Sequence, residues 1–543
     1  MRFRVCLAIA FASGYLALSY ELVWYRVFSY VSGGAANTFG YLLAFYLLGI
    51  ALGSFVVKSF CKERIGNEER GDELKRVAWF VLLSSLVSFL VVPATARLAA
   101  QSFPGTVHYS MWQAGFPIVA IAAGLLGATL PLVAHFGIEP DEHAGQRLSY
   151  IYLSNILGSS LGSFITGFWW MDAFSTGTIC MILGHIGLVV AACIFLVGAR
   201  GSKARPAHIA AYVLASLAVV IASGSPKVFD QLYERLLLKT EFKADSRFPR
   251  IVEDKHGVVV VNSIGQVYGG GIYDGAFNTD ISNKLNGIER AYAIYAMHPK
   301  PKRCLVVGLS TGSWTQVLAN LPHVEVVDVV EIGAGYLQLI REQPAVASLL
   351  SNPKVRIHID DGRRWLNRHP NERYDFILMN TTYHWRSHST NLLSQDFMRL
   401  VRGHLLPGGI HYFNSTWNSD TGEGAMVHAT AVRTYPHALR VVNFMAVSDS
   451  PIPFDRERWI EAISKTPIDG HAPTLSAEQG GTRWDELMQF AGTYATDNNA
   501  GDPWFTLEKR DSIVKRTENE GVITDDNMLS EWYFPFWKIR DYH

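Results

Sequence analysis

Three short apolar segments, each ending in a residue suited to holding a nucleoside, constrain this chain more than any other feature. The first, from Arg303, ends in a turn that contains Gly308 and Gly312. Glycine lets a backbone turn tightly at a strand end and approach a ligand closely. The second segment ends at Glu331, and the third ends at the pair Asp360-Asp361. This order and spacing predict a nucleoside-binding α/β domain.

The acidic residues of this run match the chemistry of a nucleoside. Glu331 follows Gly308 at roughly the 20-residue spacing of an acidic residue that binds ribose hydroxyls. A carboxylate of Asp360 or Asp361 can accept a hydrogen bond from an adenine amino group. Plainer alternatives stay open, because a strand-end carboxylate can cap a helix and Asp-Gly is a common turn. The predicted cofactor-binding residues are Gly308, Ser310, Gly312, Glu331, Asp360 and Asp361.

Length and composition bound the classes of protein to consider. At about 150 residues per domain, 543 residues suggest two or three domains. Lys+Arg and Asp+Glu both total 48, so nothing favours nucleic acid as a partner. The five cysteines form no CxxC pair. We therefore expect neither a disulfide framework nor a metal site.

Nearly all the long apolar runs lie before residue 226, and they predict a membrane domain of about six or seven helices over 1–225. Small residues at Gly158 to Gly162 and at Gly124 to Gly127 suit close helix packing. Glu21 is an intramembrane charge, for which we weigh an ion pair with Arg26 or another helix against a role in transport or substrate handling. The candidate spans are 5–30, 39–58, 77–98, 113–136, 150–171, 176–198 and 207–224.

The orientation of the chain depends on the last of these spans. Seven crossings would place the soluble part outside and six would place it inside. The marginal, Ala-rich segment 207–224 could instead lie at the interface or re-enter the membrane. We expect a multi-pass protein of the cell (inner) membrane with a cytoplasmic soluble part, because adenosine-type cofactors are made there.

The second half of the chain alternates strands and helices. Strand-like, glycine-punctuated segments over about 245–285 predict a small antiparallel β unit. Repeating strand–helix units then predict a doubly wound sheet whose ligands bind beyond the carboxyl ends of its strands. We expect a linker and β-hairpin subdomain over 226–285, an α/β nucleoside-binding domain over 286–450, and a C-terminal extension over 451–543 that packs on it.

Residues 245–450 resemble the spermidine synthases (polyamine aminopropyltransferases), whose membrane-fused bacterial members share this layout. The resemblance rests on Tyr273-Asp274-Gly275-Ala-Phe-Asn278, Glu331, Asp360-Asp361-Gly362, Tyr374-Asp375 and Leu406-Pro-Gly-Gly-Ile410. It implies a multispanning α-helical membrane domain followed by an α/β Rossmann-like sheet of the S-adenosylmethionine-dependent methyltransferase type. It also implies a transferase of polyamine biosynthesis that uses S-adenosylmethionine or its decarboxylated form, without a metal.

The catalytic motifs of that family are degenerate here. The family's Gly-Gly-Gly-Asp-Gly turn reads Gly308-Leu-Ser-Thr311-Gly312, and its Asp-Ser-Ser-Asp-Pro segment begins with Asn380. An asparagine cannot accept a proton from an amine as a carboxylate would. The family's Tyr-x-Glu in the preceding helix has no clean match, since Ala293 lies there. The groups that neutralise and deprotonate a polyamine are therefore mostly lost.

The loop that follows Asn380 offers replacements. His384 or His388 is a candidate base near neutral pH, and Arg386 could grip a carboxylate or phosphate. A plain solvated loop is the alternative. The predicted catalytic residues are Asn380, His384 and His388, and the predicted substrate-binding residues are Asp274, Tyr383 and Arg386.

Two functions follow from the sequence. The first is a membrane-anchored transferase that moves an aminopropyl or methyl group from an adenosyl sulfonium cofactor to an amine or other nucleophile. The second is a non-catalytic sensor or transport-coupled module that keeps the nucleoside site alone. The expected partners are the lipid bilayer and a small-molecule amine or other nucleophile, without nucleic acid, and a homodimer is compatible with the sequence.

Overall fold

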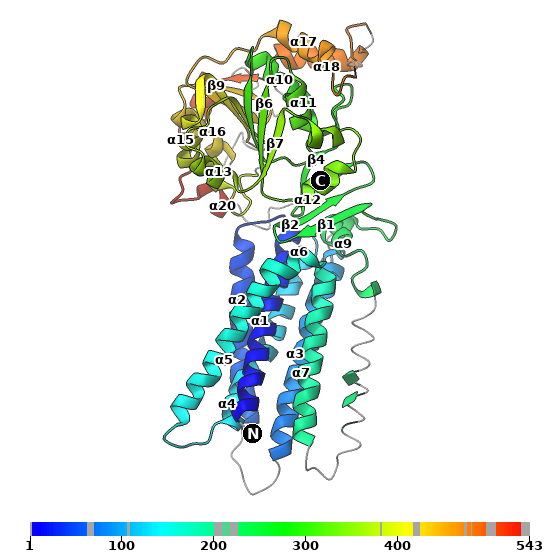
Figure 1. The fold of residues 1–543 in the computed structure, drawn as a ribbon, viewed down its shortest axis with the longest axis vertical. Coiled ribbons are helices and arrows are strands. Elements are labelled where there is room, and N and C mark those ends of the chain that lie inside the picture. The colour runs from blue at the N-terminus through cyan, green and yellow to red at the C-terminus, as the bar shows by residue number, and fades with distance from the viewer. Residues whose placement is uncertain are drawn as a thin grey trace. The chain divides into compact units, whose positions relative to one another are not determined.

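The computed structural model describes residues 3–61, 70–105, 109–199, 209, 212–213, 215–216, 226–380, 383–415, 424–471, 475–478, 480–495 and 507–533. The chain divides into two compact units. The first contains residues 1–32, 38–248 and 253–257, and the second contains 33–37, 249–252 and 258–543. The turn 33–37 thus belongs to the second unit although it links two helices of the first (Figure 1).

The first unit is helical. Among the described residues, five stretches are long and apolar enough to cross a membrane: Phe3–Val31, Asn37–Phe60, Leu74–Ala99, Trp112–Gly137 and Thr176–Val197. They correspond to α1 (Phe3–Val31), α2 (Asn37–Val57) with η1 (Lys58–Phe60), α3 (Arg70–Ala99), η2 (Trp112–Ala114) with α4 (Gly115–Gly137), and α7 (Thr176–Ala199). Five long apolar helices are compatible with a membrane-spanning region.

The two remaining predicted spans have different outcomes. Residues 150–171 form helical structure, in α5 (Ala144–Ile165), η3 (Thr166–Trp170) and α6 (Met171–Ala173), but they are not among the helices apolar enough to cross. Ser154, Asn155 and further polar residues lower the hydropathy of this stretch. Most of 207–224 lies outside the described residues. The short α9 (Leu232–Leu238) completes this unit, between η4 (Pro226–Val228) and η5 (Lys239–Glu241).

The expectation that small residues allow close helix packing is confirmed where α5 crosses α1. A Cβ atom added to Gly158 would lie 2.0 Å from the carbonyl oxygen of Phe11, and one added to Gly162 would lie 2.4 Å from that of Tyr15. Ser154 Oγ also donates to Leu7 O at 2.8 Å. Glycine is needed at these two positions because the two backbones touch there.

Arg26 pairs with Glu253 and not with Glu21, one of the partners weighed above. Arg26 Nη1 lies 3.6 Å from Glu253 Oε2, and both side chains are nearly buried. The same carboxylate oxygen accepts from Tyr233 Oη at 2.7 Å and from Thr176 Oγ1 at 2.6 Å. These hydrogen bonds satisfy a charge pair whose burial would otherwise be costly.

An antiparallel sheet of four strands lies over the segment predicted to form the small β unit. Its strands are β1 (Arg250–Asp254), β2 (Gly257–Val261), β3 (Gln266–Gly269) and β4 (Ile272–Ala276), paired in that order. A register shift occurs between Val267 and Tyr268 where β3 pairs with β4. The β3–β4 turn contains Gly270 and Gly271, both at positive φ.

The larger sheet is mixed and has eight strands in the order β12-β10-β11-β9-β8-β5-β6-β7. β5 (Arg303–Val307) pairs in parallel with β6 (Val326–Glu331) and β8 (Tyr374–Met379), β6 pairs with β7 (Val355–Ile359), and β8 pairs with β9 (Leu405–Asn414). β11 (Phe444–Ser448) runs antiparallel to β9 and to β10 (His437–Val441). The parallel strands place the carboxyl ends of β5, β6, β7 and β8 at one edge.

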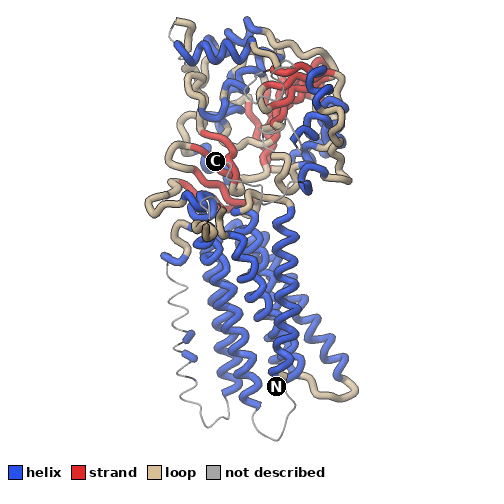
Figure 2. Tube along the Cα trace, turned by 180° about the vertical axis from the view of Figure 1, so that it is seen from behind, coloured by secondary structure: helices blue, strands red, loops and turns tan. Residues whose placement is uncertain are grey.

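Both faces of this sheet are buried. Val306 and Leu378 face one apolar core, and their neighbours Leu305 and Ile377 face the other, as the two-residue period of a strand requires. Figure 2 shows helices on both sides of these strands. The first core includes side chains from α10 (Glu289–Met297), α11 (Ser313–Asn320), α17 (Arg456–Lys465) and α18 (Gly481–Gly492); the second includes side chains from α13 (Gly362–Arg368), α15 (Gln395–Gly403), α16 (Ala425–Thr434) and α19 (Arg510–Arg516).

Two details of the second half differ from the sequence prediction. The amphipathic pattern of 392–405 predicts a single helix, but the structure has α14 (Thr390–Leu393) and α15, because the side chain of Ser394 accepts from Phe397 N and caps the second helix. The C-terminal extension does more than pack on the domain, since β12 (Leu507–Lys509) joins the sheet beside β10. The remaining elements are α12 (Gly335–Arg341), α20 (Leu529–Tyr533), η6 (Leu285–Gly287) and η7 (Ala347–Ser351).

Candidate active site

The turn between β5 and α11 has the conformation that its glycines predict. Gly308 has φ +85° and Gly312 has φ +74°. Ser310 lies between them at φ +49°, a conformation that is uncommon for a residue with a side chain. Gly308 N donates to Val330 O at 2.8 Å, which ties the start of the turn to β6. The turn therefore brings backbone to the carboxyl edge of the sheet.

Glu331 ends β6 beside this turn and is buried. Its Oε2 accepts from Leu309 N at 2.6 Å and from Ser310 N at 3.4 Å, and its Oε1 accepts from Gly333 N at 2.8 Å. Burial raises the pKa of Glu331 to about 7, against these amide hydrogen bonds, which lower it. The structure thus brings together Gly308, Ser310, Gly312 and Glu331.

Asp274 reaches the same turn from β4 of the smaller sheet. Its backbone oxygen accepts from Ser310 Oγ, and its Oδ2 accepts from Tyr336 Oη. Burial raises the pKa of Asp274 to about 6, while the bond from Tyr336 and the charge of Arg386 act to lower it. Asp274 is therefore a second buried carboxyl group beside the turn.

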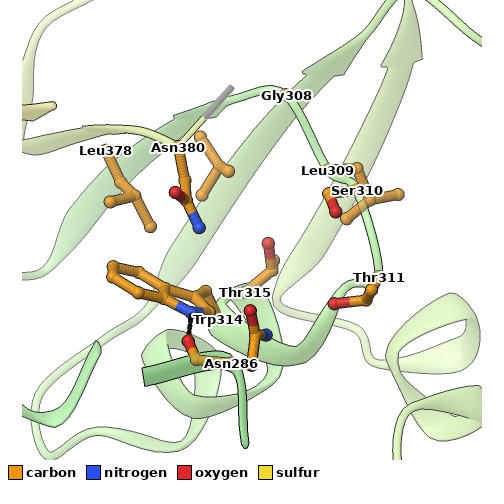
Figure 3. A pocket seen from close by; sticks show the side chains of 10 residues that line it. Asn286, Gly308, Leu309, Ser310, Thr311, Trp314, Thr315, Leu378 and Asn380 are labelled. Atoms are coloured by element: carbon orange, nitrogen blue, oxygen red, sulfur yellow. Dashed lines mark hydrogen bonds between the residues drawn. The ribbon is translucent and has the colours of Figure 1, made fainter. Parts of the chain in front are cut away.

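A small pocket lies beyond the ends of β5 and β8 (Figure 3). Trp314 and Asn380 face it from opposite sides, and Trp314 Nε1 donates to Asn286 O at 3.2 Å. None of the ten lining residues carries a carboxylate. They are Asn286, Val306, Gly308, Leu309, Ser310, Thr311, Trp314, Thr315, Leu378 and Asn380.

Asn380 belongs to a chain of amides. Its Oδ1 accepts from Asn414 Nδ2 at 3.4 Å, and Asn414 Oδ1 accepts from Asn443 Nδ2 at 3.0 Å. Arg290 Nη1 then donates to Asn443 Oδ1. The Arg290 guanidinium lies 5.3 Å from the ring centre of Trp314, within the range of a cation–π contact. A positive charge thus stands near a pocket whose ten described lining residues include no carboxylate.

The two predicted histidine bases are not among the pocket-lining residues. His384 is buried, and burial lowers its pKa to about 4. Its backbone oxygen accepts from Ser530 Oγ at 3.0 Å. His388 is exposed and has φ +66° in the turn that precedes α14. Burial thus takes the pKa of His384 below that of a base that titrates near neutral pH. The catalytic role of His388 stays a prediction.

Asp360 and Asp361 have local partners at the end of β7. Asp360 forms ion pairs with Arg364 and, at 3.5 Å, with Arg368. Asp361 Oδ1 accepts from Arg364 N at 2.8 Å and caps α13, which is the turn-and-cap alternative weighed above. Oδ2 of Asp361 has no hydrogen bond within the described chain. Adenine binding by this pair stays a prediction.

Tyr383 and Arg386 lie in the loop after β8. Tyr383 Oη donates to Tyr273 O at 3.2 Å, so the loop contacts β4. Arg386 interacts electrostatically with Asp274. Its backbone forms an isolated antiparallel β-bridge with Ala35. Sequence reasoning missed Arg290, Trp314, Asn286, Asn414 and Asn443. Trp314 stands directly after the glycine turn and could have been found from that position, whereas the others come from remote segments.

The strand order, the glycine turn after β5 and the buried glutamate after β6 define an α/β domain with a mixed sheet. Residues 293–421 match the family model described as the spermine/spermidine synthase domain. This part of the chain is therefore similar to the spermine/spermidine synthase family, and the apolar helical N-terminal region is compatible with a membrane fusion.

Individual relatives are similar over different lengths. Polyamine aminopropyltransferase 2 of Streptomyces coelicolor is 25% identical over 427 residues, which cover 75% of this chain and 73% of the relative. The polyamine aminopropyltransferase of Streptococcus pneumoniae is 35% identical over 103 residues, which cover 19% of this chain and 35% of the relative. A probable spermidine synthase structure from Corynebacterium glutamicum has a TM-score of 0.35 and 15% identity, and the match covers 52% of this chain and 97% of that one.

Proposed function

We propose that the protein is a spermidine-synthase-like transferase that moves an aminopropyl or methyl group from an adenosyl sulfonium cofactor to an amine or other nucleophile. The observation that carries this proposal is the placement of Glu331. Its buried carboxylate accepts from the backbone of the Gly308–Gly312 turn and lies at the carboxyl edge of the sheet. Polyamine aminopropyltransferases among the similar proteins support the transferase over a module without catalysis.

The residues present fit the nucleoside part of such a cofactor. Each oxygen of Glu331 accepts only from backbone amides among the described residues, so lone pairs are left for ribose hydroxyls. A Cβ atom at Gly312 would come within 3.1 Å of Leu349 and Ile340, so the turn keeps its shape only with glycine there. Ser310 would flank the same group. Asp360 and Asp361 would bind adenine through carboxylate oxygens that are not already bonded to Arg364 or Arg368.

The chemistry requires the nucleophile to lie in line with a carbon on sulfur. When bound, the sulfonium supplies that electrophilic carbon: the lone pair of the nucleophile forms the new bond, the carbon–sulfur bond breaks with its electrons going to sulfur, and the nucleophile releases a proton. Trp314 and Asn380 would line the pocket in which the nucleophile is oriented (Figure 3). Positioning would supply much of the rate because the leaving thioether needs no protonation.

The proton needs an acceptor other than Asn380. We propose Asp274, whose pKa burial raises to about 6 and whose backbone oxygen accepts from the pocket residue Ser310. A carboxyl group with such a pKa is mostly ionised at neutral pH and is a stronger base than an ordinary aspartate. His384 remains a weaker candidate, because the pKa of its ring is lowered to about 4.

The membrane assignment is part of the proposal. Five apolar helices support a multi-pass anchor, with the lipid bilayer as a partner. The cell (inner) membrane and a cytoplasmic soluble domain are proposed because adenosine-type cofactors are made in the cytoplasm. The acceptor would be a small-molecule amine or other nucleophile. Equal numbers of acidic and basic residues give no support for nucleic acid as a partner.

Isothermal titration of the detergent-purified full chain with S-adenosylmethionine, its decarboxylated form and methylthioadenosine tests the proposal. We expect at least one to bind, and Glu331→Ala to weaken it by about 10- to 100-fold, the range of a hydrogen bond to a charged group. Glu325→Gln, an exposed carboxylate that pairs with Lys302, is the control. A folded wild type that binds none of the three compounds would refute the proposal.

A further inference from the structure

Arg386 stands apart from the other arginines near the site. Arg290 donates to Asn443, to Gly287 O and to Asn286 O. Arg363 pairs with Asp525, and Arg483 pairs with Glu289. The guanidinium of Arg386 makes no hydrogen bond or ion pair within the described residues, although its side chain is partly buried. Its donors are therefore open to a ligand.

The backbone around Arg386 is held firmly. Arg386 N donates to Tyr383 O at 3.0 Å, and Arg386 O accepts from Ser389 N at 3.1 Å and from Ser389 Oγ at 2.7 Å. Ala35 forms an antiparallel bridge with Arg386, and Ser387 N donates to Gly34 O at 2.8 Å. Two segments that are about 350 residues apart in the sequence thus fix this turn.

Two glycines leave the space that the guanidinium fills. Gly34 has φ +78° and Gly270 has φ +59°. A Cβ atom at Gly34 would lie 3.2 Å from Arg386 Nε, and one at Gly270 would lie 2.8 Å from Arg386 Nη2. Both glycines combine a positive φ with close approach, so a side chain at either position would be strained and would displace the guanidinium. The guanidinium of Arg386 therefore occupies a space that depends on glycine at positions 34 and 270.

Among the described residues, Arg386 forms no ion pair with a carboxylate. The charge of Arg386 lowers the pKa of Asp274, but the Asp274 side chain accepts from Tyr336 and forms no ion pair with Arg386. Tyr383 lies within electrostatic reach of both Arg386 and Arg290. The pocket beside Asn380 has no carboxylate among its ten lining residues. A polyamine, which carries at least two positive charges, would find no acidic partner among these ten residues, and the Arg290 guanidinium lies 5.3 Å from the ring centre of the lining residue Trp314.

We propose that the acceptor carries an anionic group, a carboxylate or a phosphate, and that Arg386 binds it while the acceptor's nucleophile points toward the Trp314–Asn380 pocket. This inference rests on the transferase function proposed above. A planar guanidinium binds both oxyanions through two parallel hydrogen bonds, which a lysine cannot reproduce. The phosphate could belong to a soluble metabolite or to a lipid headgroup, and the chemistry at Arg386 would be the same.

Matched acceptors test the inference with the full chain in detergent. 4-Aminobutyrate, butylamine and putrescine share an amine and a four-carbon chain but end in an anion, a methyl group and a cation. We expect wild-type turnover to favour 4-aminobutyrate, and Arg386→Met to raise its KM by about 10- to 100-fold with kcat and the KM of butylamine unchanged. Arg386→Lys should recover only part of the loss. Arg399→Met, on the exposed face of α15, is the control.

The source of a phosphate is distinguished by two further acceptors, soluble phosphoethanolamine and vesicles of phosphatidylethanolamine in phosphatidylcholine. Turnover of either that depends on Arg386 supports the inference and identifies the source. Titration of inorganic phosphate and 4-aminobutyrate into the methylthioadenosine complex gives a readout without turnover. If neither anion binds, or if Arg386→Met binds both as wild type does, the inference is wrong while the transferase proposal stands. If methylthioadenosine and both sulfonium cofactors fail to bind, it is the proposed function that has failed.

Discussion

The carboxylate of Glu331 accepts a 2.6 Å hydrogen bond from the backbone N–H of Leu309, so the end of β6 holds the glycine turn that follows β5. The two strands are direct neighbours in the sheet. Through this bond Glu331 fixes the shape of the turn, and its carboxylate also places a negative charge beside the turn. Ligand binding at this edge should therefore depend on the ionisation of Glu331.

The affinity for methylthioadenosine should rise with pH through about 7. Ribose hydroxyls donate to the ionised carboxylate, and burial raises the pKa of Glu331 to about 7 in the free protein. At pH 6 the affinity should be about tenfold below its plateau, since one proton must be released on binding. Titrations at pH 5.5 to 8.5 measure this. Glu331→Gln should bind weakly and show a flat profile over this range, and a wild-type profile that is equally flat would contradict the assignment.

The same carboxyl group should affect stability with the opposite sign. A pKa that is higher in the folded state than the ordinary value of 4.5 favours the protonated folded protein. The stabilisation of the folded state by the raised pKa of Glu331 is fully present below about pH 4.5 and is lost as the pH rises through about 7. Thermal unfolding of wild type and Glu331→Gln should therefore diverge between these values, with wild type losing stability relative to the variant up to about pH 7 and no further above it.

The histidines should prove dispensable for proton transfer. Because burial lowers the pKa of His384 to about 4 and His388 is exposed, we expect the variant His388→Ala to keep full turnover and His384→Ala to lose stability more than chemistry. Asp274→Asn should instead lower kcat and remove a transition near pH 6 from its pH profile. A kcat that falls sharply in a folded His384→Ala variant, with Asp274→Asn unaffected, would reverse these roles.

Restoring one family carboxylate should not restore polyamine transfer. Asn380→Asp keeps an oxygen that can accept from Asn414, so the variant should fold. The other nine pocket residues still lack a carboxylate, and Arg290 remains near Trp314. We expect the rate with putrescine to change by no more than a few-fold, as measured by labelled product. Recovery of fast putrescine transfer by this change alone would show that only the base had been lost.

The contact between α1 and α5 offers a test in the helical unit. Gly158→Ala places a Cβ atom 2.0 Å from the carbonyl oxygen of Phe11, so the helices must separate. Overpacking of this kind costs about 1–3 kcal/mol. Gly145→Ala, on the same helix, has nothing within 4 Å of the added Cβ and is the matched control. Thermal unfolding in detergent should show a lower midpoint for Gly158→Ala alone, and equal midpoints would contradict the packing.

Local sequence determined much of the α/β domain. Apolar alternation and the positions of Gly308, Gly312 and Glu331 predicted β5, the turn and β6, because strand period and positive φ are properties of short segments. The close approach of Gly158 and Gly162 to α1 was predictable for the same reason. Small residues at helical spacing indicate where backbones meet.

Tertiary structure decided the rest, because charges and burial depend on residues that are remote in sequence. The sequence predicted His384 as a base near neutral pH, yet the folded chain buries its ring, and its backbone is bonded to Ser530 from the C-terminal segment. Arg290 is held beside the pocket by Trp314, Asn286 and Asn443. Arg386 lies against Gly34 and Gly270. The sequence therefore determined where a nucleoside site could form. The folded chain alone decided which charges surround it, since desolvation and pairing arise from contacts that no local pattern encodes.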